Sequence, residues 1–203
     1  MAFYTGPKAR INRRLGTLIY EDAGAARAMQ RRDQKPGMHQ RPRRPSNYGL
    51  ALMEKQKIRH YYGLGEAQLR RYFGKVSRTK GNTGQLLLIL CERRLDNVVR
   101  RAGFTSTRPQ ARQGVVHGHF QVNGTKTDVP SYQVKVGDEI NWNESTKSTG
   151  FFKERTDGIP KRPVPAWLDL NQSDMTGRVM SLPADDDLQQ TINSRLIVEF
   201  YSR

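Results

Sequence analysis

Helical spacing of apolar residues dominates the middle of the chain. Ser46 or Asn47 can cap a helix that runs to about Tyr62. A second helix is predicted through residues 69–76, after two glycines that interrupt the pattern. Residues 80–84, with the sequence Lys-Gly-Asn-Thr-Gly, predict a loop before the next helix.

Two further helices and a cap signal follow this loop. Residues 86–90 are apolar on every side, so the helix that contains them is expected to be buried. The next helix has apolar residues at positions i, i+3, i+4 and i+7, which predicts one buried face formed by Leu95, Val98, Val99 and Ala102. Thr107 and Gln110 then have the spacing of a capping box at the start of a short helix.

Alternation of polar and apolar residues replaces helical spacing after residue 119. Residues 120–127 alternate around Asn123-Gly124, a strong hairpin signal. Two more strands are predicted at residues 132–136 and 139–142, on either side of a Gly-Asp turn. Residues 93–142 therefore predict two short helices packed on a small, mainly antiparallel sheet.

The patterns near the two ends are weaker. Residues 1–45 are rich in Arg, Gly and Pro and have too few apolar residues to fold independently, which predicts a basic extended arm that becomes ordered on a partner. Residues 143–163 indicate a polar linker or weak helix, and Trp167 anchors a docking segment. An acidic patch at residues 185–187 suits a helix start, and residues 196–201 predict a final strand.

These patterns divide the chain into three regions and predict an α+β fold. The regions are a basic N-terminal arm at residues 1–45, a helical domain at residues 46–92 and a module of helices and sheet at residues 93–156. We expect the C-terminal segment, residues 157–203, to pack on the helical domain.

The basic residues are concentrated in the first part of the chain. Residues 1–119 carry 25 basic and 7 acidic side chains, a net charge of +18, whereas residues 120–203 carry 10 basic and 12 acidic side chains. The positive charge concentrated in residues 1–119 attracts a polyanion to that part of the chain. The release of counterions from phosphates drives non-specific nucleic-acid binding. The alternatives are a solvated basic surface and a membrane surface, but no basic amphipathic helix or lipidation signal supports the latter.

Known catalytic and metal-binding patterns are missing from the sequence. There is no phosphate-binding G-x-x-x-x-G-K-[ST] loop and no G-x-S-x-G nucleophile elbow. His117 and His119 offer two nitrogen ligands without the further ligands that zinc needs, and the single cysteine, Cys91, lies in an apolar helix. No run of about 18 apolar residues could span a bilayer, and the start lacks an apolar signal region. We therefore expect no enzyme activity, metal, cofactor, membrane partner or secretion.

The residues that remain support nucleic-acid binding. Residues 93–119 hold six arginines and one acid, Asp96. Arg108 and Arg112 lie four residues apart and so share a helix face, which Gln113 and the two histidines extend. Guanidinium groups grip phosphates bidentately and stack on bases, although an ordinary solvated helix face is the alternative. RNA is favoured over DNA because there is no helix-turn-helix or half-site pattern.

Ordered motifs along nearly the whole chain resemble one known family. The motifs at residues 94–99, 107–113, 117–119, 122–124 and 130–134 resemble the S-four RNA-binding module. Those at residues 4–8, 48–50, 54–57, 80–84, 165–168 and 196–202 resemble the bacterial S-four family of small-subunit ribosomal proteins.

This resemblance implies a structural constituent of the small ribosomal subunit that binds 16S ribosomal RNA (rRNA) directly and nucleates assembly of the subunit body. It also implies contact with ribosomal protein S-five, a contribution to translational accuracy and proximity to the site where mRNA enters, for which the candidates are Arg41, Arg43 and Arg44. The candidate rRNA-binding residues are Lys8, Arg10, Arg13, Arg14, Lys55, Lys57, Arg59, Arg70, Arg71, Lys80, Arg93, Arg94, Arg100, Arg101, Arg108, Arg112, Gln113, His117, His119 and Lys126.

The sequence departs from the family pattern in three places. Many relatives carry four cysteines near the N-terminus as a zinc site, whereas Ala9 stands where one would fall and no cysteine precedes Cys91. Residues 36–40 depart from a common Pro-Gly-x-His-Gly stretch, and residues 171–187 match weakly. No zinc is therefore expected. The weak match at residues 171–187 puts a contact of these residues with ribosomal protein S-five in question.

Two other functions are compatible with such a module. One is an RNA-modifying enzyme, which would need a catalytic domain larger than the residues after the module can form. The other is a free-standing RNA chaperone, which would not migrate with small subunits. We expect the bacterial cytoplasm as the location, with a plastid ribosome as the alternative.

Overall fold

The chain forms two compact units. The computed structural model describes residues 4–32, 34–38, 44–148, 152, 163–171 and 175–202. One unit, the helical unit, comprises Met1–Leu87 with Gln189–Arg203, and the other, the sheet unit, comprises Leu88–Leu188. The chain thus leaves the helical unit within one helix and returns to it near the C-terminus.

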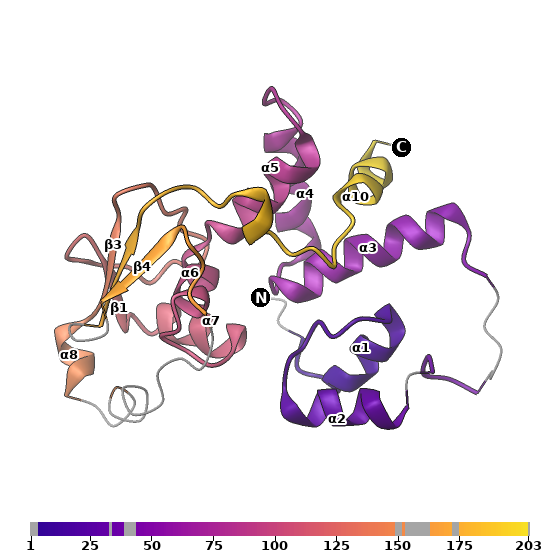
Figure 1. The fold of residues 1–203 in the computed structure, drawn as a ribbon, viewed down its shortest axis with the longest axis horizontal. Helices are drawn as coiled ribbons and strands as arrows, with labels where there is room; N and C mark the ends of the chain where they lie inside the picture. The colour runs from indigo at the N-terminus through magenta and orange to yellow at the C-terminus, as the bar shows by residue number, and fades with distance from the viewer. Residues whose placement is uncertain are drawn as a thin grey trace. The chain divides into compact units, whose positions relative to one another are not determined.

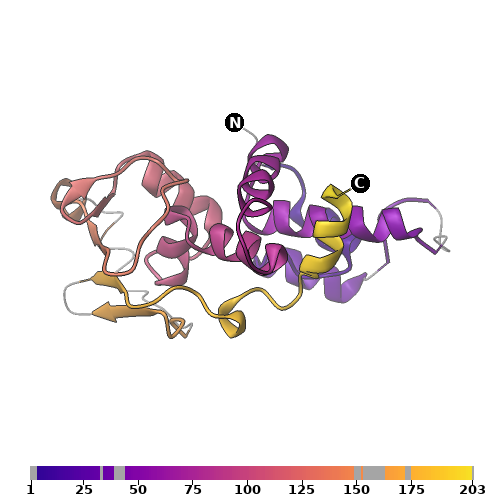
Figure 2. The same cartoon turned by 90° about the horizontal axis from the view of Figure 1, so that it is seen from above.

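The helical unit consists of helices from both ends of the chain. Its helices are α1 (Lys8–Leu15), α2 (Ala23–Arg31), α3 (Asn47–Tyr61), α4 (Glu66–Val76), the first half of α5 (Thr83–Glu92) and α10 (Ser194–Tyr201). Ser46 caps α3 as predicted, since its side chain accepts a hydrogen bond from the Gly49 N–H at 3.2 Å. Figures 1 and 2 show α10 beside α3.

The expectation of an extended arm at residues 1–45 is wrong where the structure describes that segment. It forms α1 and α2, and Ile11, Leu15 and Ile19 are buried. The buried Asn12 side chain closes the loop after α1, because it accepts from the Ile19 and Tyr20 N–H groups and donates to the Tyr20 carbonyl. A few apolar residues and the Asn12 amide are therefore sufficient to fold this segment once it packs on α3.

The predicted final strand, residues 196–201, is helix α10. Asn193 caps it by accepting from the Arg195 N–H at 3.1 Å. Ile197 is fully buried, the Phe200 ring packs at a tilt against Tyr48, and the Tyr201 ring stacks on Phe73. Packing on α3 and α4 overrides the strand preference of the β-branched residues.

The first turns of α5 and α10 are in close contact, and this gives a testable prediction. A Cβ atom on Gly84 would lie 2.7 Å from the Ser194 hydroxyl oxygen and 2.8 Å from its Cβ. Gly84→Ala is therefore expected to lower the free energy of unfolding by about 1–3 kcal/mol. The matched control is Gly74→Ala in α4, where a Cβ atom meets nothing within 4 Å, and which is expected to stabilise the helix by about 0.5–1 kcal/mol.

Urea denaturation followed by far-ultraviolet circular dichroism measures both variants. Equal stabilities for the two would contradict close packing between α5 and α10. Ser194→Gly in the Gly84→Ala background should restore most of the loss, because it removes the atoms that the new methyl group meets.

The sheet unit packs two helices on a five-stranded sheet. Its elements are α6 (Leu95–Arg101), α7 (Arg108–Val116), β1 (Phe120–Val122), β2 (Thr125–Lys126), β3 (Glu139–Trp142), α8 (Glu144–Lys147), β4 (Leu168–Asn171), β5 (Thr176–Val179) and the short 3₁₀ helix η1 (Asp185–Asp187). The strand order is β2-β1-β3-β5-β4, and all pairs are antiparallel. The α+β class predicted from the sequence is confirmed, with α6 and α7 beside the sheet (Figure 1).

The core of this unit contains the predicted apolar face. Leu95, Val98, Val99 and Ala102 are at most 1% exposed and pack with residues of α7 and the strands. The rings of Phe104, Phe120 and Trp142 fill the space between helices and sheet. The hairpin at Asn123-Gly124 is also confirmed, since both residues have positive φ, as a type I′ turn requires.

Two predictions in the sheet region need correction. Residues 132–136 form only an isolated bridge from Gln133 to Arg94, because Leu95 donates to the Tyr132 carbonyl and Val134 donates to the Arg93 carbonyl. The segment is therefore attached to the start of α6 instead of extending the sheet. Residues 168–171 and 176–179, which we expected to pack on the helical domain, form β4 and β5 of the sheet instead.

The loop prediction at residues 80–84 is correct only in its first half. Asn82 accepts hydrogen bonds from the N–H groups of Gly84 and Gln85, so α5 begins at Thr83. Thr107 caps α7 as predicted, but the Gln110 side chain accepts from the Ser106 N–H in place of the Thr107 N–H. The first difference moves the start of α5 two residues into the predicted loop, and the second changes the partner of one side chain.

Candidate nucleic-acid interface

A buried carboxylate connects two of the candidate arginines. The Arg94 guanidinium is fully buried and donates to both oxygens of Asp96, at 3.0 and 2.7 Å. Arg112 reaches the same carboxylate from α7, with its Nη1 3.2 Å from Oδ2, and its side chain is 26% exposed. Arg94 therefore holds Asp96 from inside, while Arg112 remains accessible to a ligand.

A second buried carboxylate, that of Glu92, holds another candidate arginine in place. Glu92 is fully buried, accepts from the Asn97 amide, and bonds Arg101 through Nε at 3.1 Å and Nη2 at 2.7 Å. The Asn97 oxygen in turn accepts from Arg108 Nε at 3.2 Å. Arg101 and Arg108 are both partly exposed. We call Arg101, Arg108 and Arg112 the anchored arginines.

The sequence argument missed the acids behind the anchored arginines. A signal existed, because Asp96 is the one acid among six arginines in residues 93–119. Arg94 and Arg100, which that argument counted among the candidate rRNA-binding residues, are both buried, at 0% and 8% exposure. Arg93 is partly buried, and its Nε donates to the Val134 carbonyl at 3.0 Å.

Further candidate residues lie on α7 and in the segment that follows it. Gln113, His117 and Lys126 are exposed, and the two histidine rings lie 5.7 Å apart. His119 Nδ1 lies 3.1 Å from the Thr146 hydroxyl. Burial, with the charges of His117 and Lys126, lowers the pKa of His119. A neutral imidazole at this place can stack or exchange hydrogen bonds without adding charge.

The helical unit exposes a second basic set around the end of α4. Arg70, Arg71 and Lys80 are exposed, as the sequence argument required. Lys75 and Arg78, which that argument did not single out, are exposed in the same segment. Helical spacing alone could have found Lys75, since it follows Arg71 by four residues.

Two of the candidate lysines are instead occupied inside the helical unit. Lys55 is buried, pairs with Glu66 at 2.8 Å and lies 4.5 Å from the Phe200 ring centre. Burial would raise the pKa of Glu66, but hydrogen bonds from Lys55 and Tyr201 hold it below its ordinary value. Lys57 pairs with Glu54 at 2.6 Å. Lys55 therefore attaches α3 to α4 and α10, while Lys57 is held by a carboxylate of its own helix, so neither forms an open phosphate site.

The N-terminal candidates divide in the same way. Arg10 and Arg14 on α1 are exposed, whereas Lys8 pairs with Asp22 at 2.5 Å and Arg13 donates to the Gln34 carbonyl at 2.8 Å. The side chain of Arg59 on α3 is partly exposed and donates to Gln56. Of the three residues proposed for mRNA, Arg44 is exposed, while Arg41 and Arg43 lie outside the described residues.

The described part of the chain contains neither a candidate metal cluster nor a candidate membrane span. No group of three or more His, Cys, Asp or Glu side chains there could hold a metal ion. Cys91 is buried in α5, and this burial raises the pKa of its thiol. The thiol is therefore unsuited to bind zinc. None of the described helices is both long and apolar enough to cross a bilayer.

Comparison with known proteins agrees with this arrangement. Residues 3–92 match the family described as "Ribosomal protein S4/S9 N-terminal domain", and residues 93–140 match "S4 domain". The chain is 58% identical over 208 residues to the small ribosomal subunit protein uS4 of Rhodopirellula baltica, and each chain is covered completely. The uS4 proteins of Roseiflexus castenholzii and Persephonella marina are 49% and 45% identical, again over 100% of both chains. These relatives are ribosomal structural proteins and not enzymes. The chain therefore belongs to the bacterial uS4 family.

Proposed function

We propose that this protein is a structural constituent of the small ribosomal subunit that binds 16S rRNA directly, before most other proteins. The observation that carries the proposal is the set of anchored arginines, which three residues of α5 and α6, Glu92, Asp96 and Asn97, hold in place. Family membership supplies the ribosomal context.

The physical argument concerns the entropy of the arginine side chains. A free arginine loses rotamer freedom when it binds a phosphate, which costs about 0.5–1.5 kcal/mol per side chain. The anchored arginines have already lost part of this freedom, because Arg101 and Arg112 pair with buried carboxylates. Their remaining N–H groups can grip phosphate oxygens or stack on unpaired bases. Such a surface suits a folded RNA read by its shape.

Exposed basic side chains of the helical unit provide further phosphate contacts. We propose that Arg10, Arg14, Arg70, Arg71 and Lys80, with the missed Lys75 and Arg78, bind rRNA together with the sheet unit. A protein with two such basic units could nucleate assembly of the subunit body by holding separate RNA helices. Contact with ribosomal protein S-five, a contribution to accuracy and proximity of Arg44 to entering mRNA belong to the same proposal, with the bacterial cytoplasm as its location.

The direct test replaces two anchored arginines. Arg108→Ala combined with Arg112→Ala is expected to weaken binding to an RNA fragment of the 16S 5′ domain about 10- to 100-fold, since charged hydrogen bonds contribute about 1.5–3 kcal/mol before partial compensation. Filter binding or fluorescence anisotropy at fixed salt measures the affinity. The fold should survive, because Asp96 keeps Arg94 and Asn97 keeps Glu92 as partners.

A matched control is available in the same unit. Arg178 on β5 is exposed but lies across from Glu139 and Asp169 on the neighbouring strands. Arg178→Ala removes one arginine charge of the same kind and should change the affinity less than about twofold, since the carboxylates on both neighbouring strands disfavour a phosphate there. Equal affinities for the double variant and the wild type would move the RNA site away from α6 and α7.

A further inference from the structure

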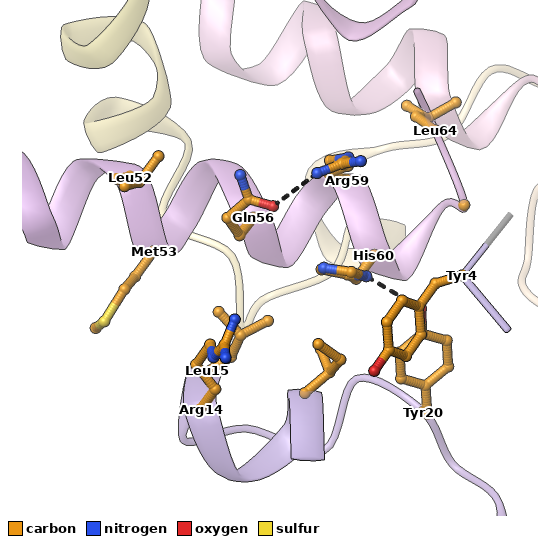
Figure 3. A pocket seen from close by; sticks show the side chains of 12 residues that line it. Tyr4, Arg14, Leu15, Tyr20, Leu52, Met53, Gln56, Arg59, His60 and Leu64 are labelled. Atoms are coloured by element: carbon orange, nitrogen blue, oxygen red, sulfur yellow. Dashed lines mark hydrogen bonds between the residues drawn. The ribbon is translucent and has the colours of Figure 1, made fainter. Parts of the chain in front are cut away.

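A cavity in the helical unit is not explained by the contacts described so far. It has a volume of about 620 Å³ and lies between α1 and α3 (Figure 3). Its walls include Tyr4, Tyr20 and His60 on one side and the apolar residues Ile11, Leu15, Leu52, Met53 and Leu64 elsewhere. Binding sites for small organic groups have volumes of about 300–1,000 Å³. The cavity is therefore large enough for a nucleotide-sized group.

Three aromatic rings form the polar side of this cavity. The ring of Tyr4 lies 6.3 Å from Tyr20 in a stacked arrangement and 5.5 Å from His60 in an edge contact. The Tyr20 hydroxyl oxygen lies 3.1 Å from His60 Nδ1, which fixes both rings (Figure 3). Fixed aromatic faces are the usual platforms for unstacked bases in proteins that bind single-stranded nucleic acid.

The charges around the cavity favour an anion. Arg14 and Arg59 line it, and none of its lining residues is acidic. Burial, together with the charges of Arg59 and Arg14, lowers the pKa of His60 to about 4, so the imidazole is neutral at pH 7. Asp22, whose charge adds to burial in raising the pKa of the lining residue Tyr20, pairs with Lys8. The cavity thus combines two guanidinium groups with neutral aromatic rings.

We propose that this cavity binds one unstacked nucleotide of the RNA partner, with the base against the rings of Tyr4, Tyr20 and His60. The phosphate of that nucleotide then faces Arg14 and Arg59, which supply the only charges among the lining residues. This inference rests on the proposed function, because the nucleotide belongs to the RNA that the protein is proposed to bind. The exposed Arg10 and Arg14 on α1 bring that RNA strand to the cavity. A free nucleotide shares the same chemistry and is the other source that the test separates.

The first experiment asks whether the cavity recognises a nucleotide at all. The full-length protein is titrated with adenosine 5′-monophosphate, adenosine or inorganic phosphate, and the carbon–proton signals of the His60 ring are followed by NMR. We expect the monophosphate to shift these signals most, because it alone offers both a base and an anion. Shifts of equal size with inorganic phosphate, or no shift with the monophosphate, would overturn the proposal.

Variants at Tyr4 identify stacking as the cause. Tyr4→Ala is expected to weaken binding of the monophosphate about 5- to 150-fold, which corresponds to the about 1–3 kcal/mol that a stacked base contributes. Tyr4→Phe retains the ring and should bind within about twofold of the wild type. The control is Tyr48→Ala, which removes a half-exposed ring of the same unit outside the cavity. Similar losses for Tyr4→Ala and Tyr48→Ala would exclude stacking in the cavity.

The second experiment distinguishes the two sources. Ultraviolet irradiation of the complex with the 5′-domain RNA is expected to crosslink a base to Tyr4, Tyr20 or His60, as mapped by mass spectrometry. Binding of the monophosphate without such a crosslink would show that the cavity takes free nucleotides, which overturns the RNA assignment. If the RNA binds normally but neither signal appears, the proposed function stands and this inference fails.

Discussion

Replacing Asp96 with alanine is expected to lower the free energy of unfolding of the sheet unit by about 3–5 kcal/mol, the cost of removing one partner of a buried ion pair. Asp96 is 5% exposed and accepts hydrogen bonds from the fully buried Arg94. Without the carboxylate, a buried guanidinium loses its counter-charge in a medium of low dielectric constant. A loss of this size is a large fraction of the 5–15 kcal/mol that stabilises a typical domain.

The location of the tryptophans makes this prediction easy to measure. The chain has two tryptophans, Trp142 and Trp167, and both are buried in the core of the sheet unit. Urea denaturation followed by tryptophan fluorescence therefore reports the unfolding of this unit alone. The control is Asp128→Ala, which removes an exposed carboxylate from the same unit and should change the stability by less than about 0.5 kcal/mol.

A second variant separates the ion pair from simple packing. Arg94→Met combined with Asp96→Leu replaces both charges with apolar groups, and such replacements are often neutral or stabilising. The double variant should therefore be more stable than Asp96→Ala alone. Its Arg112 would lack the carboxylate that holds it, so its RNA affinity should still fall. Recovery of stability together with full RNA affinity would show that Asp96 does not position Arg112.

Features set by local sequence could be predicted from the sequence. The buried face of α6 follows from the spacing of Leu95, Val98, Val99 and Ala102, and the Asn123-Gly124 turn follows from the positive φ that those two residues tolerate. Both depend on residues within one or two turns of one another. The basic surface of α7 could be found for the same reason, because Arg108 and Arg112 share a helix face.

Features set by distant partners could not be predicted in this way. Residues 196–201 have the composition of a strand, but contacts with α3 and α4 make them helical. In the sequence, Lys55 is a candidate RNA ligand, but in the structure it pairs with Glu66 and lies over the Phe200 ring. The cavity beside His60 also depends on α1 meeting α3 across a long stretch of sequence. The pattern of residues along the sequence does not show which distant segments come into contact.

The second large effect concerns salt. The affinity for the 5′-domain RNA is expected to fall linearly on a log–log scale, with a slope of about −0.7 to −0.9 for each phosphate neutralised. If the exposed basic side chains neutralise six to ten phosphates, the affinity drops about 10³- to 10⁵-fold between about 50 and 200 mM salt. The concentration of basic residues before residue 120 makes this dependence steep, since 25 of the 35 basic side chains lie there.

The slope also tests which side chains carry the interaction. Removing Arg108 and Arg112 together should make the slope shallower by about 1.4–1.8, the amount for two phosphates, whereas Arg178→Ala should leave it unchanged. Anisotropy titrations at five or more salt concentrations, with one labelled RNA, determine each slope. A flat profile for the wild type would refute electrostatic docking altogether. A steep profile that the double variant does not alter would place the phosphate contacts on the helical unit, where Arg70, Arg71 and Lys80 are the next residues to replace.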